Sequence, residues 1–313
     1  MKLITGTDDI KLNNTVITIG KFDCLHLGHM MLIDVASGMK EPGMQQVIFT
    51  FDNNPNDVVN NCLDRQIVSG NERDYRAVKN RVDCIVEYPF THEVRNMTPK
   101  EFVRDILVKK MDARAVVCGD DFRFGYDRTG DADVLAGLGE EYGFRVRIVE
   151  RIKYKGRAIS STYIRQELLK GNLSDVNEML GRNFTMTSVV EKGFHIGRKM
   201  GLPTINFKIS EDKLLPPDGV YITETEIDGM RFASITNIGV RPTFHKDGER
   251  LVETYISGFD GNAYGRMAIV HFHEFIRPEI KFAGAGELAQ QIKTDLEIMK
   301  KYFNKMGRMK ENG

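Results

Sequence analysis

Two histidines, His26 and His29, lie within the segment 20–29, which directly follows the apolar, β-branched run 15–19. Such a run is typical of a buried parallel strand, and the residues from Gly28 onward have the pattern of a helix. The turn is therefore expected at the carboxyl end of a strand, where the N–H groups of a helix's first turn can bind phosphate. Two imidazoles at this point could stabilise charge on a phosphorus centre without forming a covalent intermediate.

The spacing His-x-Gly-His has a physical reason, because Gly28 between the histidines lets a nucleotide lie close to the backbone while both imidazoles reach its phosphates. Two surface histidines on a helix would give the same four letters, and that is the commoner origin of so short a motif. The other polar segments of the chain must decide between these two interpretations.

A second turn of mixed chemistry, residues 119–125, follows the apolar run 113–118. Asp121 could bind a hydroxyl or amino group of a ligand. Phe122 and Phe124 could pack on the rings of a ligand, or they could be core residues at alternate positions.

A third segment, residues 159–165, places hydroxyl groups at the start of a helix. Ser161 and Thr162 could simply cap that helix, which is the usual role of hydroxyls at such a position. Arg165 lies one turn further on, and it would clamp a pyrophosphate if it faced the same site as the two histidines.

The elements that must position these turns alternate up to about residue 180. Apolar strand-like runs occupy 15–20, 45–51, 83–87, 114–118 and 144–150, and helical patterns lie near 28–38, 72–80, 98–110 and 131–142. This alternation predicts a doubly wound parallel sheet of the α/β class. Thr98, followed by Pro99 and then by Glu101, is a strong helix start, and Gly143 is expected to end a helix.

The second half of the chain has a different pattern. Ser174 is expected to cap a short helix that ends near Leu180 and Gly181. Alternating strands then occupy 184–192, 219–227, 231–238, 251–257 and 266–275, and an amphipathic helix follows at 287–303. Asp228-Gly229 between two strands is a hairpin signal, so we expect a small antiparallel β-barrel with a terminal helix. The 313 residues are thus divided into an N-terminal domain, 1–183, and a C-terminal domain, 184–313.

Composition narrows the classes of partner. Lys plus Arg equals Asp plus Glu, at 44 each, so no net field favours nucleic acid or anionic membranes. The N-terminus lacks the apolar core of a signal peptide and no apolar stretch reaches membrane-spanning length, so we expect a cytoplasmic protein. The four cysteines are widely spaced, and neither a zinc site nor a disulfide framework is expected from them.

Taken together, the three N-terminal segments resemble the bacterial bifunctional riboflavin kinase/FAD synthetase family. Its pattern is roughly Gly-x-Phe-Asp-Gly-x-His-x-Gly-His, then Gly-x-Asp-Phe-x-Phe-Gly, then Ile-Ser-Ser-Thr-x-Ile-Arg, and the chain meets these motifs in order. The resemblance implies an FMN adenylyltransferase in which His26 and His29 handle the ATP phosphates. It implies further that Ser161, Thr162 and Arg165 complete that site.

The second half extends the resemblance. Residues 193–206 resemble the Pro-Thr-x-Asn loop of the family's kinase domain, and residues 237–244 match its Asn-Ile-Gly-x-Arg-Pro-Thr-Phe. Glu253 is then the candidate general base, because the primary hydroxyl of riboflavin is a poor nucleophile and needs a carboxylate to take its proton. Without the resemblance, Glu253 is a solvated strand charge and Thr204 belongs to an ordinary turn.

The resemblance implies a role for each residue of the two sites. The implied catalytic residues are Glu253, His26, His29 and Arg165, and the implied Mg²⁺ ligands are Thr204 and Asn206. The implied ATP and phosphate contacts are Gly20, Phe22, Asp23, Gly28, Ser161, Thr162, Gly197, Arg198 and Asn237. The implied flavin contacts are Asp121, Phe122, Phe124 and Arg277. ATP, riboflavin and FMN are the implied substrates. Magnesium accepts such oxygen ligands together with phosphate oxygens and water.

Three departures from the family pattern leave a second hypothesis open. Lys21 replaces an asparagine, Cys24 a glycine, and Asn53-Asn54-Pro55 the family's Pro-His-Pro. Cys24 would be strained if the backbone there needed a positive φ. The alternatives are therefore a kinase whose N-terminal half is weakened or silent, and a flavin-binding regulator without turnover. His271 and His273, two apart on a strand, could bind a metal, although no third ligand is visible.

Overall fold

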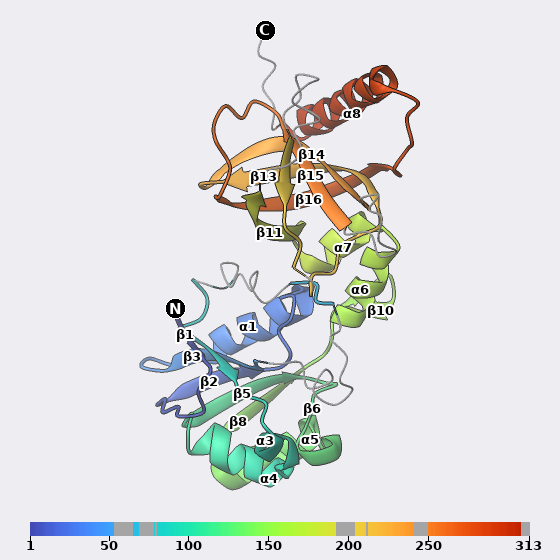
Figure 1. Ribbon diagram of the computed structural model, residues 1–313. Coiled ribbons are helices and arrows are strands. Elements are labelled where there is room, and N and C mark those ends of the chain that lie inside the picture. Colours follow the sequence, from blue (N-terminus) through green and yellow to red (C-terminus); the bar gives the residue numbers. More distant parts are fainter. Residues whose placement is uncertain are drawn as a thin grey trace. The chain divides into compact units, whose positions relative to one another are not determined.

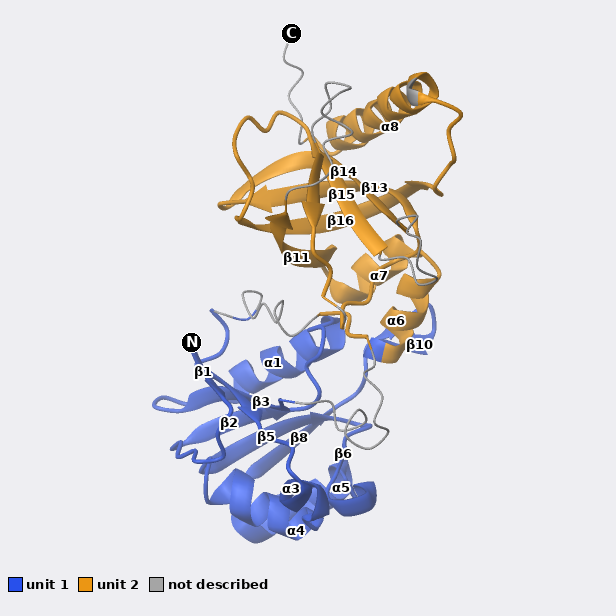
Figure 2. Ribbon diagram, viewed as in Figure 1, with its two compact units in different colours: residues 1–64, 74–161 blue, residues 65–73, 162–313 orange. Residues whose placement is uncertain are grey.

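A computed structural model describes residues 1–52, 65–68, 78, 80–191, 204–210, 212–240 and 250–307. The chain forms two compact units (Figure 2). Unit 1 consists of residues 1–64 and 74–161, and unit 2 consists of residues 65–73 and 162–313.

Unit 1 contains a six-stranded sheet in which all neighbouring strands are parallel. In spatial order its strands are β1 (Lys2–Thr5), β4 (Cys84–Tyr88), β3 (Gln45–Phe51), β2 (Thr15–Ile19), β5 (Ala113–Gly119) and β8 (Arg145–Val149). The predicted parallel sheet is confirmed. Strand β1 was not predicted, because it lies at the edge of the sheet with mostly exposed side chains and so lacks the apolar run of a buried strand.

Helices cover both faces of this sheet (Figure 1). They are α1 (Leu27–Met39), α3 (His92–Asn96), α4 (Pro99–Phe102) with its π-helical continuation Val103–Val108, and α5 (Ala132–Tyr142). Successive strand residues point to opposite faces. Val16 of β2 accordingly packs in one core cluster with Leu32 of α1, whereas Ile17 packs in another with Ile106 of the π-helical segment.

Two predicted helix boundaries in unit 1 are confirmed. Thr98 and Glu101 form a reciprocal capping box at the start of α4, with Pro99 in the first helical position. Gly143 ends α5 in the left-handed conformation, with φ 80°. The predicted helix 98–110 differs in its second half, where wider turns form, as in the bond from the Met111 N–H to the Ile106 carbonyl.

Unit 2 contains a closed antiparallel barrel. Around the barrel the strands are β11 (Phe184–Glu191), β12 (Thr204–Phe207), β15 (Arg250–Ile256), β14 (Met230–Val240), β13 (Gly219–Ile227) and β16 (Met267–Arg277). Helix α8 (Ala285–Lys305) packs on the outside, where Met299 and Phe303 bury against Ile222 and Ile235. The predicted barrel with a terminal helix is confirmed.

The hairpin between β13 and β14 confirms the turn that Asp228-Gly229 predicts. Asp228 and Gly229 alone form the loop, and both have positive φ, 51° and 78°. This is the backbone that a two-residue hairpin turn needs to match the twist of its strands.

The barrel interior is polar at its centre, where buried hydroxyls bond to one another in a chain of Thr225, Ser234, Thr223, Thr236 and Thr254.

Short elements complete both units. They are the two-residue strands β6 (Arg123–Phe124), β7 (Gly130–Asp131), β9 (Lys153–Tyr154) and β10 (Arg157–Ala158), the 3₁₀ turn Tyr126–Arg128, and the helices α6 (Ser161–Leu169) and α7 (Leu173–Leu180). Asn172, not Ser174, is the N-cap of α7, so that part of the prediction is wrong. Helix α7 packs on the barrel, where the Asn177 amide donates to the Phe272 carbonyl at 3.0 Å. The functional division at residues 183 and 184 stays a prediction.

Candidate active sites

The first site lies where the strand order of the unit 1 sheet changes direction. From β2 the chain continues to β3 on one side and later returns to β5 on the other side. The carboxyl ends of the parallel neighbours β2 and β5 therefore meet at one edge of the sheet. Such a switch point leaves a crevice that binds ligands in open α/β sheets. The predicted segments 20–29 and 119–125 lie at these two carboxyl ends.

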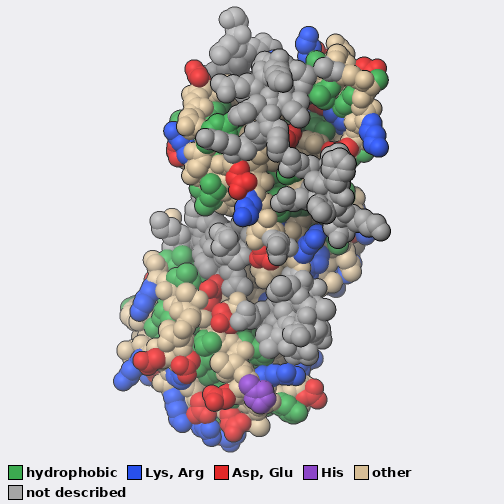
Figure 3. Space-filling view, in the orientation of Figure 1, with side chains coloured by type: hydrophobic (Ala, Val, Ile, Leu, Met, Phe, Trp, Pro, Cys, Tyr) green, Lys and Arg blue, Asp and Glu red, His purple; other side chains and the backbone are tan. Residues whose placement is uncertain are grey.

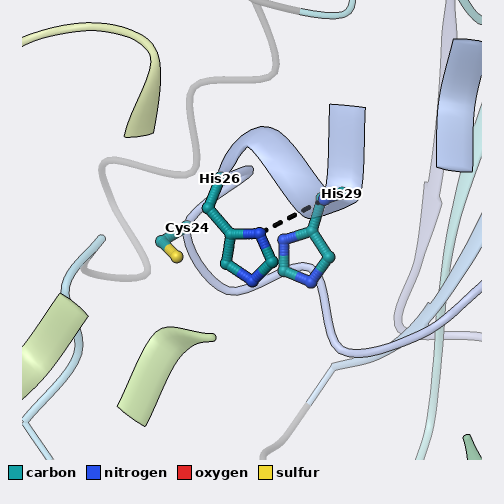
Figure 4. Close-up of side chains that lie close together, drawn as sticks. All are labelled: Cys24, His26 and His29. Carbon is teal, nitrogen blue, oxygen red and sulfur yellow. Dashed lines mark hydrogen bonds between the residues drawn. The ribbon is translucent and has the colours of Figure 1, made fainter. Parts of the chain in front are cut away.

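His26 and His29 form a stacked pair at the N-terminus of α1 (Figure 4). Their ring centroids lie 3.7 Å apart with an angle of 10° between the planes. His26 is the N-cap, and its Nδ1 accepts the backbone N–H of His29 at 3.2 Å. Both rings are buried, with exposed fractions of 6% and 9%. The alternative of two surface histidines is therefore wrong.

Neighbouring residues fix the position of these rings. Phe22 packs against His29 with ring centroids 4.8 Å apart. A Cβ at Gly28 would lie 3.0 Å from Cε1 of His26, so the glycine leaves room for the ring. At Gly20 an added Cβ would make only ordinary contact, 3.4 Å from the Phe22 ring.

The geometry of the turn removes the expected strain at Cys24. The positive φ of this turn, 46°, belongs to Leu25, and Cys24 is not among the residues with positive φ. A cysteine in place of glycine therefore needs no left-handed backbone, and the condition for strain at Cys24 is not met. Lys21 is exposed, and Asn53-Asn54-Pro55 lies outside the described residues.

A hydrogen-bonded chain runs beside the histidines. The Ser161 hydroxyl donates to Oδ1 of Asp23 in a short bond, and Cys24 Sγ lies 3.5 Å from the Ser161 oxygen. Because the single hydroxyl proton of Ser161 is directed at Asp23, the thiol is the donor to Ser161. The structure thus brings Ser161 to the adjacent residues Asp23 and Cys24, from which it is far apart in sequence.

The turn after β5 contains both exposed and core residues. Asp121 is exposed and pairs with Arg151 at 3.2 Å. Phe122 is partly buried and stacks on Phe124 with ring centroids 5.3 Å apart. Phe124 itself packs in the core next to Phe102, and its contact with a flavin stays a prediction. Of the two aromatics, Phe122 is the one that keeps an exposed surface for a ring.

Thr162 and Arg165, which the resemblance adds to this site, are counted in unit 2. There Nε of Arg165 donates to the backbone carbonyl of Arg65 at 3.4 Å. Their roles toward the ATP phosphates stay predictions.

The second site lies on the outer face of the barrel in unit 2. Asn206 on β12 and Asn237 on β14 are the direct cross-strand partners of Glu253 on β15. Directly opposed residues point to the same face of a sheet, so these three side chains form one row. Thr204, two residues before Asn206, shares that face by the strand period of two. Four residues that the sequence placed in the kinase site are therefore neighbours.

The charges around Glu253 suit a proton acceptor. Burial raises the pKa of Glu253, and the negative charge of Glu279 raises this pKa further. Nδ2 of Asn237 donates to the Glu279 carboxylate at 3.1 Å. A Cβ on Gly239 would collide with that carboxylate, so the glycine makes room for it. Sequence reasoning assigned no role to Glu279, because its nearness to Glu253 depends on how the chain returns after β16.

Arg277 is the predicted flavin contact of this unit. Its guanidinium is paired with Asp295 of α8 through Nε and Nη2, at 3.1 and 2.8 Å, and Asp295 is 2% exposed. Gln291 donates to the same carboxylate at 3.0 Å. Gln291 also lines an open depression together with Ile280, Lys281, Phe282, Glu287, Gln290 and Thr294. Arg277 thus lies at the edge of a surface that offers an aromatic ring and amide groups.

The remaining predicted contacts are Gly197 with Arg198, and the pair His271 and His273. Gly197 and Arg198 lie outside the described residues. His271 and His273 lie near carboxylates, at 3.3 Å from Glu226 and 3.0 Å from Glu224 respectively. Among the described residues, the group that could hold a metal ion is a different one, Cys24 with His26 and His29, which the sequence analysis did not recognise.

The molecular surface agrees with the balanced composition. In Figure 3 the Lys and Arg side chains of the visible face are interspersed with Asp and Glu. Within the parts of the chain that the structure describes, no helix is long and apolar enough to cross a membrane.

Comparisons with known proteins cover nearly the whole chain. A family model described as FAD synthetase matches residues 8–163, and one described as riboflavin kinase matches residues 180–303. A bifunctional riboflavin kinase/FMN adenylyltransferase from Buchnera aphidicola subsp. Schizaphis graminum is 32% identical over 97% of this chain and 99% of the relative. The protein of the same description from Escherichia coli strain K12 is 31% identical, over 97% and 98%.

A solved structure is similar in fold over almost its full length. The crystal structure of a protein from Streptococcus pneumoniae, described as a macrolide-efflux protein, matches with a TM-score of 0.85. The two chains are 29% identical, and the match covers 94% of this chain and 96% of the other.

Proposed function

The chain belongs to the family of bifunctional riboflavin kinases/FMN adenylyltransferases, and we propose from this that its two units divide the two reactions between them. Unit 2 transfers the γ-phosphoryl group of ATP to riboflavin and so makes FMN. Unit 1 joins FMN to the AMP moiety of ATP and releases pyrophosphate. The row of Asn206, Glu253 and Asn237 on the barrel carries the first assignment, and the stacked histidines carry the second.

In the kinase reaction, Glu253 takes the proton of the riboflavin 5′-hydroxyl as the phosphoryl group is transferred. A raised pKa improves a carboxylate as a base, provided that it is still ionised at the working pH. Burial and the Glu279 charge supply this tuning at Glu253. Asn237 and Asn206 flank the base on both sides and can orient the hydroxyl or the phosphates.

Thr204 and Asn206 fit a magnesium ion. A hydroxyl and an amide oxygen on one face of β12, next to a carboxylate, are donors of the hard oxygen type that Mg²⁺ prefers, together with phosphate oxygens and water. When bound there, the ion would neutralise charge on the transferred phosphate. Gly197 and Arg198 would contact the rest of the nucleotide.

The depression beside α8 is the proposed place of the flavin ring in unit 2. Phe282 offers an aromatic surface, and Gln291 offers an amide that can bond to polar edges of the ring. Arg277 lies beside Phe282, with its guanidinium carbon 5.9 Å from the ring centroid, and it is held there by the buried Asp295. The ion pair of Arg277 and Asp295 thus fixes one edge of the depression.

In the adenylylation reaction, His26 and His29 stabilise charge on the ATP phosphates at the N-terminus of α1. This chemistry depends on positioning, and the buried stack provides a fixed position. Arg165 and Thr162 would bind the departing pyrophosphate, while Asp121 and the exposed side of Phe122 would face the flavin or the nucleotide. Asp23 is held ready by its bond from Ser161.

A kinase with a weakened or silent N-terminal half is the competing hypothesis, which the departures at Lys21, Cys24 and Asn53-Asn54-Pro55 motivate, and strain at Cys24 is the physical reason given for it. Because the positive φ belongs to Leu25, that reason for inactivity no longer applies. The full bifunctional activity is therefore the better supported proposal.

The test supplies the purified chain with Mg²⁺ and ATP, adds either riboflavin or FMN, and follows FMN and FAD by chromatography. The native chain should convert riboflavin through FMN to FAD. Glu253→Gln should lose FMN formation by at least about a hundredfold yet still convert added FMN to FAD. His29→Ala should show the opposite pattern. Loss of both activities in a variant with a native circular dichroism spectrum and melting temperature would contradict the division of roles.

A further inference from the structure

The turn that carries the histidine pair also carries a thiol. Cys24 Sγ, one nitrogen of His26 and one nitrogen of His29 all lie within 4.8 Å of one another. Figure 4 shows the three side chains gathered around the start of α1, with Cys24 beside the His26 ring. All three are buried, and Cys24 is 1% exposed.

We propose that Cys24, His26 and His29 form a zinc site that, when occupied, stops FAD formation. Thiolate and imidazole are the donors that Zn²⁺ selects, whereas Mg²⁺ selects oxygen. The site would thus remain distinct from magnesium sites even in a solution rich in Mg²⁺. Three protein ligands leave a fourth coordination position for water.

The distances are compatible with this ion after a small adjustment. With Zn–S near 2.3 Å and Zn–N near 2.0–2.1 Å, tetrahedral ligand atoms lie roughly 3.3–3.6 Å apart. The widest present separation of 4.8 Å exceeds this by a little over an ångström. A change of side-chain rotamer at Cys24 or His26 can supply such a movement, because both residues lie in the turn before the regular part of α1.

Binding involves a defined exchange of protons and bonds. The Cys24 thiol loses its proton and the resulting thiolate donates an electron pair to the metal. The chain from Cys24 through Ser161 to Asp23 offers a route and an acceptor for that proton. At His26, Nδ1 accepts the backbone N–H of His29. A neutral imidazole has one nitrogen lone pair in the ring plane, and this cap bond uses it. A metal bond at either ring nitrogen of His26 therefore replaces the cap bond.

The consequence for activity rests on the proposed function, whereas the metal site does not. If both imidazoles serve the ATP phosphates, a metal that takes their lone pairs removes them from that task. Riboflavin phosphorylation in unit 2 uses none of the three ligands, so it serves as an internal control in the same tube.

The test uses the full chain after treatment with a chelator and reduction of its thiols, with Co²⁺ as the spectroscopic probe. One equivalent of Co²⁺ should give visible bands of tetrahedral cobalt and a near-ultraviolet thiolate-to-cobalt band, and Zn²⁺ should remove both. Cys24→Gly, which restores the residue usual in the family pattern, should lose the thiolate band and at least about tenfold in affinity, since even outer-shell partners of a metal contribute that much. Cys24→Ser gives a second variant of nearly unchanged shape.

Matched controls are Cys62→Ser and Cys118→Ala, which should keep the band. In the native chain, Zn²⁺ should inhibit FMN-to-FAD conversion but not FMN formation, and Cys24→Gly should need at least about tenfold more Zn²⁺ for the same inhibition. The absence of a thiolate band in the native chain, or its persistence in both Cys24 variants, would overturn the site. A band without any effect of Zn²⁺ on an active adenylyltransferase would overturn the inhibition. The spectrum is read without turnover, so a chain that shows the band but makes no FAD would contradict only the proposed function.

Discussion

At the scale of single residues, the barrel site depends on two carboxylates with different tasks. Glu253 sits half-buried between Asn206 and Asn237 and is the proposed base. Glu279 is exposed, and the Asn237 amide and the space above Gly239 keep it near Glu253. A like charge close to a carboxylate disfavours its ionised form. If Glu253 is the base, Glu279 therefore acts on the reaction by raising the pKa of Glu253.

This arrangement predicts how the kinase reaction depends on pH. Glu253 must be ionised to accept a proton, so activity is present above its raised pKa and is lost as the pH falls through it. Glu279→Gln removes the negative charge but keeps an acceptor for Asn237. The pKa of Glu253 should then fall, and the acid limb of kcat/KM for riboflavin should move to lower pH.

The matched control is Glu274→Gln, an exposed strand carboxylate that is not among the groups shifting the pKa of Glu253. Its acid limb should coincide with that of the native chain. An acid limb that stays in place in Glu279→Gln would contradict either the coupling or the role of Glu253. Glu253→Gln tests the role of Glu253 separately from its coupling to Glu279, because this variant should lose the kinase activity at every pH.

At the scale of elements, α1 positions the histidines of unit 1 through its first turn. Gly28 has an ordinary helical backbone, and alanine there is favoured over glycine by helix propensity, by up to about 1 kcal/mol. An alanine Cβ would however lie 3.0 Å from the His26 ring, which must then shift by a few tenths of an ångström. The helix and the site thus have opposite preferences at this residue.

Gly28→Ala should therefore leave the stability of unit 1 unchanged or slightly higher while FMN-to-FAD conversion falls about tenfold, since misplacement by even an ångström can cost a hundredfold. FMN formation should not change. Gly38→Ala in the same helix is the control, because nothing lies within 4 Å of its added Cβ. It should stabilise the helix without loss of either activity. Full adenylylation by Gly28→Ala would show that the position of His26 is not critical.

The elements themselves were predictable wherever a buried face produced a clear pattern. Strands β2, β3 and β13 lie within a residue of their predicted ranges, because each carries a run of apolar or β-branched residues. The sequence predicts a loop where strand β12 forms, since its four residues follow Pro203 and are too few for a period to show. Its pairing with β15 is nevertheless what brings Thr204 and Asn206 to Glu253. The motifs thus single out these residues, and tertiary pairing explains why they lie side by side.

At the scale of the whole molecule, the chain does not simply complete one unit before it begins the other. Residues 65–73 belong to unit 2 although the flanking residues belong to unit 1. Gln66 forms a β-bridge with Lys213, and the Leu214 N–H donates to the Gln66 carbonyl at 2.8 Å. Composition and periodicity predict a single boundary, because a short segment that pairs through Gln66 with the distant Lys213 leaves no local signal.

Lys213 holds this segment in unit 2, and its replacement tests whether the segment stabilises the barrel. The side chain is 3% exposed, and its ammonium donates to the carbonyls of Ile67 and Thr185, each at 2.7 Å. Lys213→Met keeps most of the volume but leaves both carbonyls without this donor, which should lower the free energy of unfolding of unit 2 by about 1–3 kcal/mol. Urea unfolding followed by riboflavin kinase activity would measure the loss, and amide hydrogen exchange at Gln66 and Leu214 should become faster.

The exposed Lys208→Met serves as the control and should change neither measurement. Unaltered exchange at Gln66 in Lys213→Met would mean that the backbone pairing alone retains the segment, and the buried ammonium would then have no part in joining it to the barrel.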